Sequence, residues 1–259
     1  MPKVKAMFKE LVKMPKLSSL KDVLFVGPHP DDIEFGCGAL ISKIKENGGT
    51  VHFLIVTDGS SGTDDPLLPP SELKKIREKE ATDAAFYLKA DSIDFIGFED
   101  GGLFTSEDVT REVAKYIMKY APDAVFSPDP HLRNECHNDH IKTGEGVRGA
   151  MQIVAYPEAL KRHHVETKDA NPCRKPIVLV YYFTDYPNAF EEVSKKNVGD
   201  KLSALSLHKS QMSGDSKMLL DYFLYKARQD GKKHHVLLAE VFQVIIPICQ
   251  HVYSDGLKM

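Results

Sequence analysis

The apolar run at residues 23–26, together with the polar turn that follows it, constrains the fold of this chain more than any other segment. Four apolar residues that stop at Gly and Pro are typical of a buried strand, and the apolar spacing at residues 40–44 is typical of a helix. His29, Asp31 and Asp32 therefore lie in a turn between a strand and a helix. In open α/β sheets, ligands bind in the crevice beyond the carboxyl ends of the strands.

The polar side chains of this turn allow a plain explanation and a chemical one. An aspartate at a helix start commonly accepts hydrogen bonds from free backbone N–H groups, and His29 would then be a bystander. Imidazole and carboxylate together are also what a catalytic divalent metal binds. Pro30 favours an extended conformation of His29, which fixes the direction of its side chain.

Strands and helices alternate along the rest of the chain. The pattern predicts strands at 23–26, 51–57, 92–96, 124–127, 178–183 and 239–245, and helices at 33–47, 71–88, 106–120, 140–155, 199–209 and 217–229. Short apolar strands separated by helices indicate an α/β fold, a Rossmann-like three-layer sandwich with a mostly parallel sheet and helices on both faces. We expect a single domain over residues 1–259, with a helical extension at 1–20 and a surface loop at 161–176.

Length and charge exclude several classes of protein. A chain of 259 residues can bury a full α/β core. Its net charge of −3 predicts that it binds neither nucleic acid nor an anionic membrane surface. The longest apolar segment, residues 236–252, is interrupted by polar side chains, so we expect no membrane span. The four cysteines form no Cys-x-x-Cys pair and no secretory signal is visible, which predicts reduced thiols and a cytoplasmic location.

Polar clusters follow each of the first four predicted strands. The second strand is followed by a Gly/Ser/Asp loop at 58–65, the third by residues 99–102, and the fourth by a His-Asn-Asp-His segment at 137–140. Ordinary turn chemistry is the plain explanation of each loop taken alone, above all of the loop at 58–65. A ligand from the last cluster would complete His29 and Asp32 and leave a fourth position for water, which is the layout of a catalytic zinc site.

Seven short motifs occur in a fixed order along the chain. They are His29-Pro30-Asp31-Asp32, Thr57-Asp58-Gly59, Ile76-Arg77-x-x-Glu80, Asp100-Gly101-Gly102-Leu103, His137-x-Asp139-His140, Leu207-His208-Lys209-Ser210-Gln211 and Ala239-Glu240-x-Phe242. Their order resembles that of the LmbE-like, or PIG-L, family of zinc-dependent N-deacetylases. Within the family, the loop at 57–65 and residues 127–130 look most like the diacetylchitobiose deacetylase branch.

The resemblance implies a metal site and a base. His29, Asp32 and His140 would bind Zn²⁺, and Asp31 would act as the general base. Neighbouring aspartates cannot both point at one metal without strain, so one can ligate while the other reaches the water that zinc activates near neutral pH.

The resemblance also implies roles for residues around the metal. His137 would donate to the oxyanion, and Asp139 would hold His137 in the required tautomer and raise its pKa. Arg77 and Asp100 would bind the substrate, and His251 would reach the active site of a neighbouring subunit.

Two features of the 136–140 segment depart from the family pattern. Asn138 stands where proline is common. Cys136 lies four residues before His140, so that on a helix the two side chains would share a face and a Cys136 thiolate could ligate the metal.

Two other classes of protein fit the sequence less well. A dinucleotide-binding protein would need a third glycine after residues 35–38, and a phosphoesterase would favour two metals and more carboxylates.

The expected function is removal of the acetyl group from an N-acetylglucosamine-type substrate: diacetylchitobiose, N-acetylglucosamine or a glucosaminyl conjugate. The alternatives are a deacylase of another small N-acyl amide and a non-catalytic sugar-binding relative. The resemblance further implies a homo-oligomer, such as a trimer or hexamer.

Overall fold

The computed structural model describes residues 14–165, 173, 177–212 and 216–250. Its strands are β1 (Asp22–Gly27), β2 (Thr50–Thr57), β3 (Ser92–Phe98), β4 (Ala124–Pro128), β5 (Val178–Tyr182), β6 (Ala189–Glu192) and β7 (Ala239–Ile245). Its α-helices are α2 (Asp32–Glu46), α3 (Pro70–Tyr87), α4 (Ser106–Tyr120), α5 (Asn138–Ile153), α6 (Pro157–Arg162), α7 (Lys195–Leu205) and α8 (Ser216–Lys233). Short 3₁₀ helices occupy Leu17–Ser19 and Pro247–Cys249.

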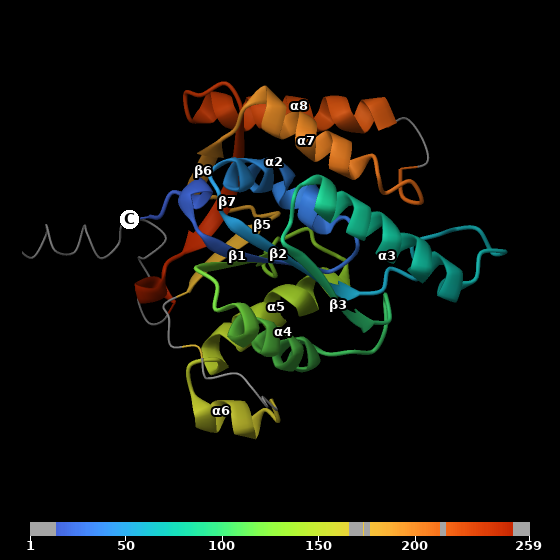
Figure 1. Ribbon diagram of the computed structural model, residues 1–259, viewed down its shortest axis with the longest axis vertical. Helices are drawn as coiled ribbons and strands as arrows, with labels where there is room; N and C mark the ends of the chain where they lie inside the picture. The colour runs from blue at the N-terminus through green and yellow to red at the C-terminus, as the bar shows by residue number, and fades with distance from the viewer. Residues whose placement is uncertain (1–13, 166–172, 174–176, 213–215, 251–259) are drawn as a thin grey trace, which may run out of the picture.

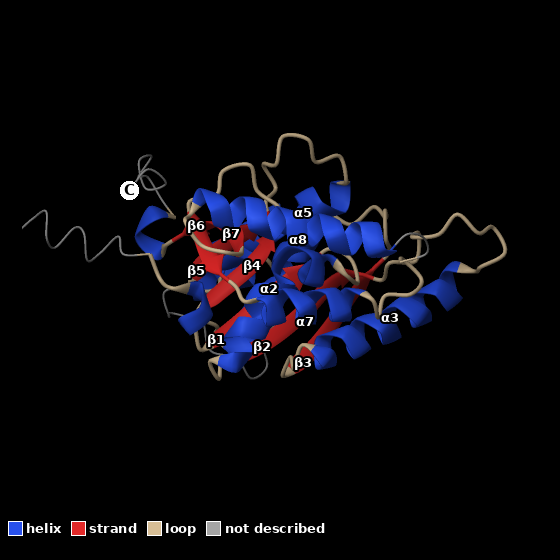
Figure 2. Cartoon of the chain, turned by 90° about the horizontal axis from the view of Figure 1, so that it is seen from above, coloured by secondary structure: helices blue, strands red, loops and turns tan. Residues whose placement is uncertain are grey.

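The strands form one sheet in the order β3-β2-β1-β4-β5-β7-β6. Strands β1 to β5 pair in parallel, whereas β7 pairs antiparallel with both β5 and β6. Figure 1 shows α2, α7 and α8 on one face of the sheet and α4, α5 and α6 on the other. Seen from above in Figure 2, the strands run behind α2, α7 and α8. The predicted α/β sandwich with a mostly parallel sheet and helices on both faces is confirmed.

Both faces of the sheet are buried, which explains why β1 is continuously apolar. The ring of Phe25 packs toward α2 and stacks on Phe126 of β4, with 4.4 Å between ring centroids. The next positions, Leu24 and Val26, point to the opposite face and pack among residues of α4 and α5. Since successive strand residues face opposite sides, only a sheet covered on both faces requires four apolar residues in a row.

Several predicted boundaries differ from the structure. Strand β6 was not expected, because it is short and half polar. Helix α6, which begins at a proline, was not expected either, and the first two residues of the predicted loop at 161–176 belong to it. Helix α7 starts four residues earlier than predicted, because Ser194 caps it by accepting the backbone N–H of Asn197. No helix in the described ranges is long and apolar enough to cross a membrane.

A buried ion pair fixes α2, whose first residue is Asp32, to helix α7 and strand β7. The Lys201 ammonium on α7 lies 2.7 Å from a carboxylate oxygen of Glu240 on β7. The other oxygen of Glu240 accepts the backbone N–H of Leu40 in α2 at 2.8 Å. One carboxylate therefore joins two helices and a strand away from solvent.

We expect Glu240→Ala to lower the free energy of unfolding by about 3–5 kcal/mol, because it leaves the buried Lys201 charge without its partner. Urea unfolding followed by circular dichroism would measure the change. Lys79→Ala, which breaks an exposed ion pair with Asp83 on α3, serves as the control and should leave stability unchanged. Equal stabilities of the two variants would contradict the prediction.

Candidate metal centre

The predicted ligands meet at the crevice between β1 and β4, where the chain leaves the two neighbouring strands toward opposite faces of the sheet. Strand β1 leads into α2 on one face, and β4 leads through a loop into α5 on the other. His29 lies in the first connection, Asp32 opens α2, and His140 lies in the first turn of α5. This is the position at which doubly wound sheets bind ligands.

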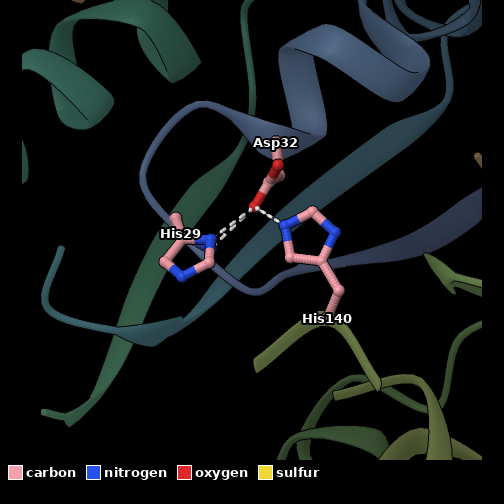
Figure 3. Close-up of side chains that lie close together, drawn as sticks. All are labelled: His29, Asp32 and His140. Carbon is pink, nitrogen blue, oxygen red and sulfur yellow. Dashed lines mark hydrogen bonds and ion pairs between the residues drawn. The ribbon is translucent and has the colours of Figure 1, made fainter. Parts of the chain in front are cut away.

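The carboxylate of Asp32 lies between two imidazoles. Its Oδ2 atom is 3.0 Å from Nδ1 of His29 and 3.3 Å from Nε2 of His140, as Figure 3 shows. One potential ligand atom from each of the three residues lies within 4.8 Å of the others. Two nitrogens and one carboxylate oxygen, brought together in a mostly buried place, fit a borderline-soft divalent ion such as Zn²⁺.

Helix capping does not account for the two aspartates. Asp31 occupies the N-cap position of α2, yet its side chain makes no capping hydrogen bond and instead accepts from Nη2 of Arg77 at 3.2 Å. Asp32 accepts the backbone N–H of His29 at 2.9 Å. The backbone of Asp31 has φ of 142°, a conformation that costs a non-glycine residue of the order of 1–3 kcal/mol and that clusters at functional sites.

The environments of the two aspartates separate their pKa values. Burial and the adjacent Asp32 raise the pKa of Asp31 to about 7, although the positive charge of Arg77 opposes them. Burial also acts to raise the pKa of Asp32, but its contacts with His140 and His29 outweigh burial and hold that pKa well below its usual range. Asp32 is therefore the permanently ionised member, and Asp31 is the one that can exchange a proton near neutral pH.

Further carboxylates lie behind the two histidines. Nε2 of His29 is 3.2 Å from Oδ1 of Asp100 and 3.6 Å from Oδ2 of Asp139. Nδ1 of His140 is 3.0 Å from Oε2 of Glu135. These distances are short enough for ion pairs, but Nε2 of His29 and Nδ1 of His140 do not have the geometry of a hydrogen bond. Carboxylates behind metal-binding imidazoles orient the rings and raise their basicity.

This carboxylate cluster favours a positive charge at the centre. Burial lowers the pKa of His29, but its contacts with Asp100, Asp139 and Asp32 outweigh burial and raise the pKa to about 11. A divalent cation would satisfy the same electrostatic demand. The donor set and its surroundings are thus consistent with a metal site.

His137 and Asp139 lie next to this centre but interact differently from the expectation. The ring of His137 meets that of His29 edge-on at 4.5 Å between centroids, and together with Asp139 the two form a second group of possible ligands that shares His29. The buried Asp139 accepts the backbone N–H of Gly101 at 2.8 Å. Asp139 acts to raise the pKa of His137, as expected, but burial and the charges of His29 and His140 outweigh it and lower that pKa overall.

A polar cavity of about 350 Å³ opens beside the metal group. Arg77 and Asp100 both line it, as a substrate-binding role would require. Arg77 is held by the carbonyl oxygens of Gly59 and Pro30 at 3.1 and 3.0 Å. The lining consists of His29, Asp31, Ser61, Gly62, Arg77, Asp100, Gly101, His137 and Gln211.

Sequence reasoning missed three residues that shape the site. Ser61 donates its backbone N–H to Asp100 at 3.1 Å, and Gln211 donates to the carbonyl of Gly62 at 3.0 Å. Glu135 contacts His140 and also accepts the backbone N–H of His137 at 2.8 Å. The Gly/Ser loop and the Leu207-to-Gln211 motif pointed to the first two, but no pattern singled out Glu135.

Two further candidates have different outcomes. Within the described part of the chain neither group of possible ligands includes Cys136, whose sulfur lies 3.7 Å from the carbonyl oxygen of Asn134. Because α5 begins only at Asn138, Cys136 and His140 do not share a helix face, and a thiolate ligand is not supported. His251 lies outside the described residues, so its role stays a prediction.

The sequence and the structure both match known proteins. Residues 24–151 match the PIG-L family, described as GlcNAc-PI de-N-acetylase. The chain is 30% identical over 237 residues to the diacetylchitobiose deacetylase of Thermococcus kodakarensis, covering 90% of this chain and 87% of that protein. It is 28% identical over 198 residues to a probable N-acetyl-alpha-D-glucosaminyl L-malate deacetylase 2 of Bacillus anthracis, covering 74% and 82%.

A solved structure agrees with these relatives. The N,N'-diacetylchitobiose deacetylase of Pyrococcus horikoshii superposes with a TM-score of 0.87 at 28% identity, covering 98% of this chain and 96% of that one. The similarity therefore extends over both faces of the sheet and over the crevice that holds the metal group.

We expect His29→Ala and Asp32→Asn each to abolish stoichiometric zinc binding, because each removes one of three donors. Zinc retained after dialysis would be measured by mass spectrometry. His163→Ala, which removes a partly exposed histidine paired with Glu107, is the matched control and should retain the metal. Stoichiometric zinc in His29→Ala would rule out this site.

Proposed function

Because this chain belongs to the PIG-L family of N-deacetylases, which hydrolyse amide bonds, we propose that it removes the acetyl group from an N-acetylglucosamine-type substrate. One observation carries the proposal. The metal group, a buried carboxylate with its pKa near neutrality and a sugar-sized polar cavity all meet at one crevice. A binding protein without catalysis would not require that carboxylate.

The proposed metal ligands are His29, Asp32 and His140. Zn²⁺ held there supplies a Lewis acid and a water of lowered pKa. Asp100 and Glu135 would keep the two imidazoles in the orientation that binding requires.

Asp31 is the proposed general base. It lines the polar cavity, whereas Asp32 points between the two histidines, and this matches a division into base and ligand. Asp31 would take the proton of the attacking water and pass it to the departing amine. A carboxyl group whose pKa lies near neutrality can do both at physiological pH.

His137 is the proposed donor to the carbonyl oxygen as negative charge develops there. It lines the same cavity, and its ring lies against that of His29. Asp139, buried next to both groups, would contribute by orienting this part of the site. A positioned donor of this kind typically contributes 10²–10³-fold, that is about 2.7–4 kcal/mol, to the rate.

Arg77 and Asp100 are proposed to bind the sugar. Both face the cavity, and their remaining contacts hold them rigidly against the loop at 59–62. Candidate substrates are diacetylchitobiose, N-acetylglucosamine and a glucosaminyl conjugate, the first and last of which correspond to names among the relatives. A homo-oligomer, a contribution of His251 to a neighbouring site and a cytoplasmic location stay predictions.

We expect Asp31→Asn to lower kcat for acetate release by about 10²–10⁴-fold while zinc stays bound, because the base is lost but no ligand is. Zinc-loaded protein would be assayed with N-acetylglucosamine, diacetylchitobiose and a glucosaminyl-malate conjugate. Asp83→Asn on the exposed face of α3 is the matched control. Absence of acetate from all three substrates, with zinc bound, would contradict the proposed function.

The Arg77 charge should set the acid limb of the pH profile. Asp31 must be ionised to act as a base, so activity is present above its pKa and is lost below it. Arg77 lowers that pKa, so Arg77→Gln should move the acid limb of kcat/KM to higher pH, whereas Arg77→Lys keeps the charge and should move it less. A limb that stays in place or moves to lower pH in Arg77→Gln would show that Asp31 is not the titrating base.

A further inference from the structure

The chain that follows α7 is fixed to two other helices by carboxylates. Nε2 of His208, a fully buried imidazole, lies 3.3 Å from Oε1 of Glu34 on α2. Ser210 donates its backbone N–H at 2.9 Å and its hydroxyl at 2.6 Å to the carboxylate of Glu80 on α3. These contacts fix the position of the next residue, Gln211.

Gln211 lines the polar cavity, as Arg77 does. Its Nε2 atom donates to the carbonyl oxygen of Gly62 at 3.0 Å and to the hydroxyl of Ser210 at 3.2 Å. A Cβ added at Gly62 would lie 2.6 Å from Nη1 of Arg77 and 3.1 Å from Oε1 of Gln211. Both side chains therefore approach the backbone of Gly62 closely, and a cation and a neutral amide share this wall of the cavity.

Hydrogen bonding fixes which end of the Gln211 amide is the oxygen. The carbonyl of Gly62 can only accept, and the hydroxyl of Ser210 donates its one proton to Glu80, so toward Gln211 it can only accept as well. Both contacts therefore require the amide nitrogen. Among the residues that the structure describes, Oε1 has no hydrogen-bond partner, and it is the acceptor that Gln211 leaves for a ligand in the cavity.

A second cavity, of about 480 Å³, is enclosed by α2, α7, α8 and β7. Glu135 and Phe183 line it and both contact His140: the carboxylate lies 3.0 Å from Nδ1, and the Phe183 ring stacks on the imidazole with 6.2 Å between centroids. These contacts separate the second cavity from the metal group. The polar cavity, which Gln211 lines, is therefore the place where a substrate at the metal group is recognised.

We propose that Gln211 is a specificity-determining residue whose Oε1 atom accepts a hydrogen bond from a hydroxyl group of the bound sugar. The inference rests on the proposed function, which places the sugar in the polar cavity. A sugar hydroxyl has a proton to donate and lone pairs that accept. The Arg77 guanidinium can only donate, whereas the Gln211 amide supplies an acceptor on the same wall. Because this acceptor is neutral, it adds no further negative charge near the carboxylates of the site.

The test measures how strongly the protein distinguishes N-acetylglucosamine from its 3-, 4- and 6-deoxy analogues. Zinc-loaded Asp31→Asn protein, in which hydrolysis is slowed, would be titrated calorimetrically with each compound. We expect one analogue to bind at least about fivefold more weakly than N-acetylglucosamine, because it leaves Oε1 of Gln211 without a partner. Equal binding of all four compounds, or no binding of N-acetylglucosamine, overturns the proposal.

Two substitutions separate a direct contact with the sugar from the hold on Gly62. Gln211→Met removes both the donor to Gly62 and the acceptor, whereas Gln211→Glu removes the donor and keeps an acceptor. We expect Gln211→Met to reduce the discrimination against that analogue by at least about fivefold and Gln211→Glu to retain it. Gln229→Met, the same change at an exposed position of α8, should also retain it. Equal loss in Gln211→Met and Gln211→Glu would assign the effect to the contact with Gly62 and overturn the proposal.

Acetate release separates this proposal from the proposed function. With Asp31 intact, Gln211→Met should raise KM for N-acetylglucosamine by about fivefold or more and change kcat little, because Gln211 holds the sugar and not the reacting atoms. Discrimination among the sugars that depends on Gln211 supports the proposal even if no acetate is released. Acetate release with a KM that Gln211→Met leaves unchanged overturns the proposal and leaves the deacetylase function intact.

Discussion

A single carboxylate oxygen organises the candidate site. Oδ2 of Asp32 accepts the backbone N–H of His29 at 2.9 Å and lies 3.0 and 3.3 Å from the imidazole nitrogens of His29 and His140. It thereby joins the turn after β1, the start of α2 and the first turn of α5. The arrangement depends on the rigid parallel pairing of β1 with β4, which brings these segments together, and on Glu240, which anchors α2 from behind.

Two adjacent aspartates acquire opposite chemistry from their surroundings. The histidines around Asp32 keep that carboxylate ionised, whereas burial and the neighbouring negative charge raise the pKa of Asp31. Strained backbone at Asp31 turns its side chain toward the polar cavity and away from the two imidazoles. Pairs of carboxyl groups whose pKa values are pushed apart are typical of sites that need one permanent ligand or charge and one proton carrier.

Two cavities of different polarity lie beside the metal group. Arg77, Asp100 and backbone groups surround the first, whereas aromatic rings and neutralised ion pairs surround the second. The partition between them is built from His140 and the side chains that contact it, Glu135 and Phe183. A change at the partition therefore affects the metal geometry as well as the shape of the second cavity.

Local pattern along the chain was enough to predict the α/β class, most strands and helices, and a turn in which His29 and Asp32 await a ligand from residues 137–140, because continuous apolar strands and polar turn residues report burial and chain direction directly. The choice of His140 within that cluster came from the family resemblance. The rest depended on how distant segments pack together in three dimensions. Glu135, Ser61 and Gln211 entered the site through contacts between segments that no periodicity links. The lowered pKa of His137 likewise followed from its burial and from the charges of His29 and His140 beside it. Pairwise distance and burial control such effects, and neither is encoded in the spacing of residues along the chain.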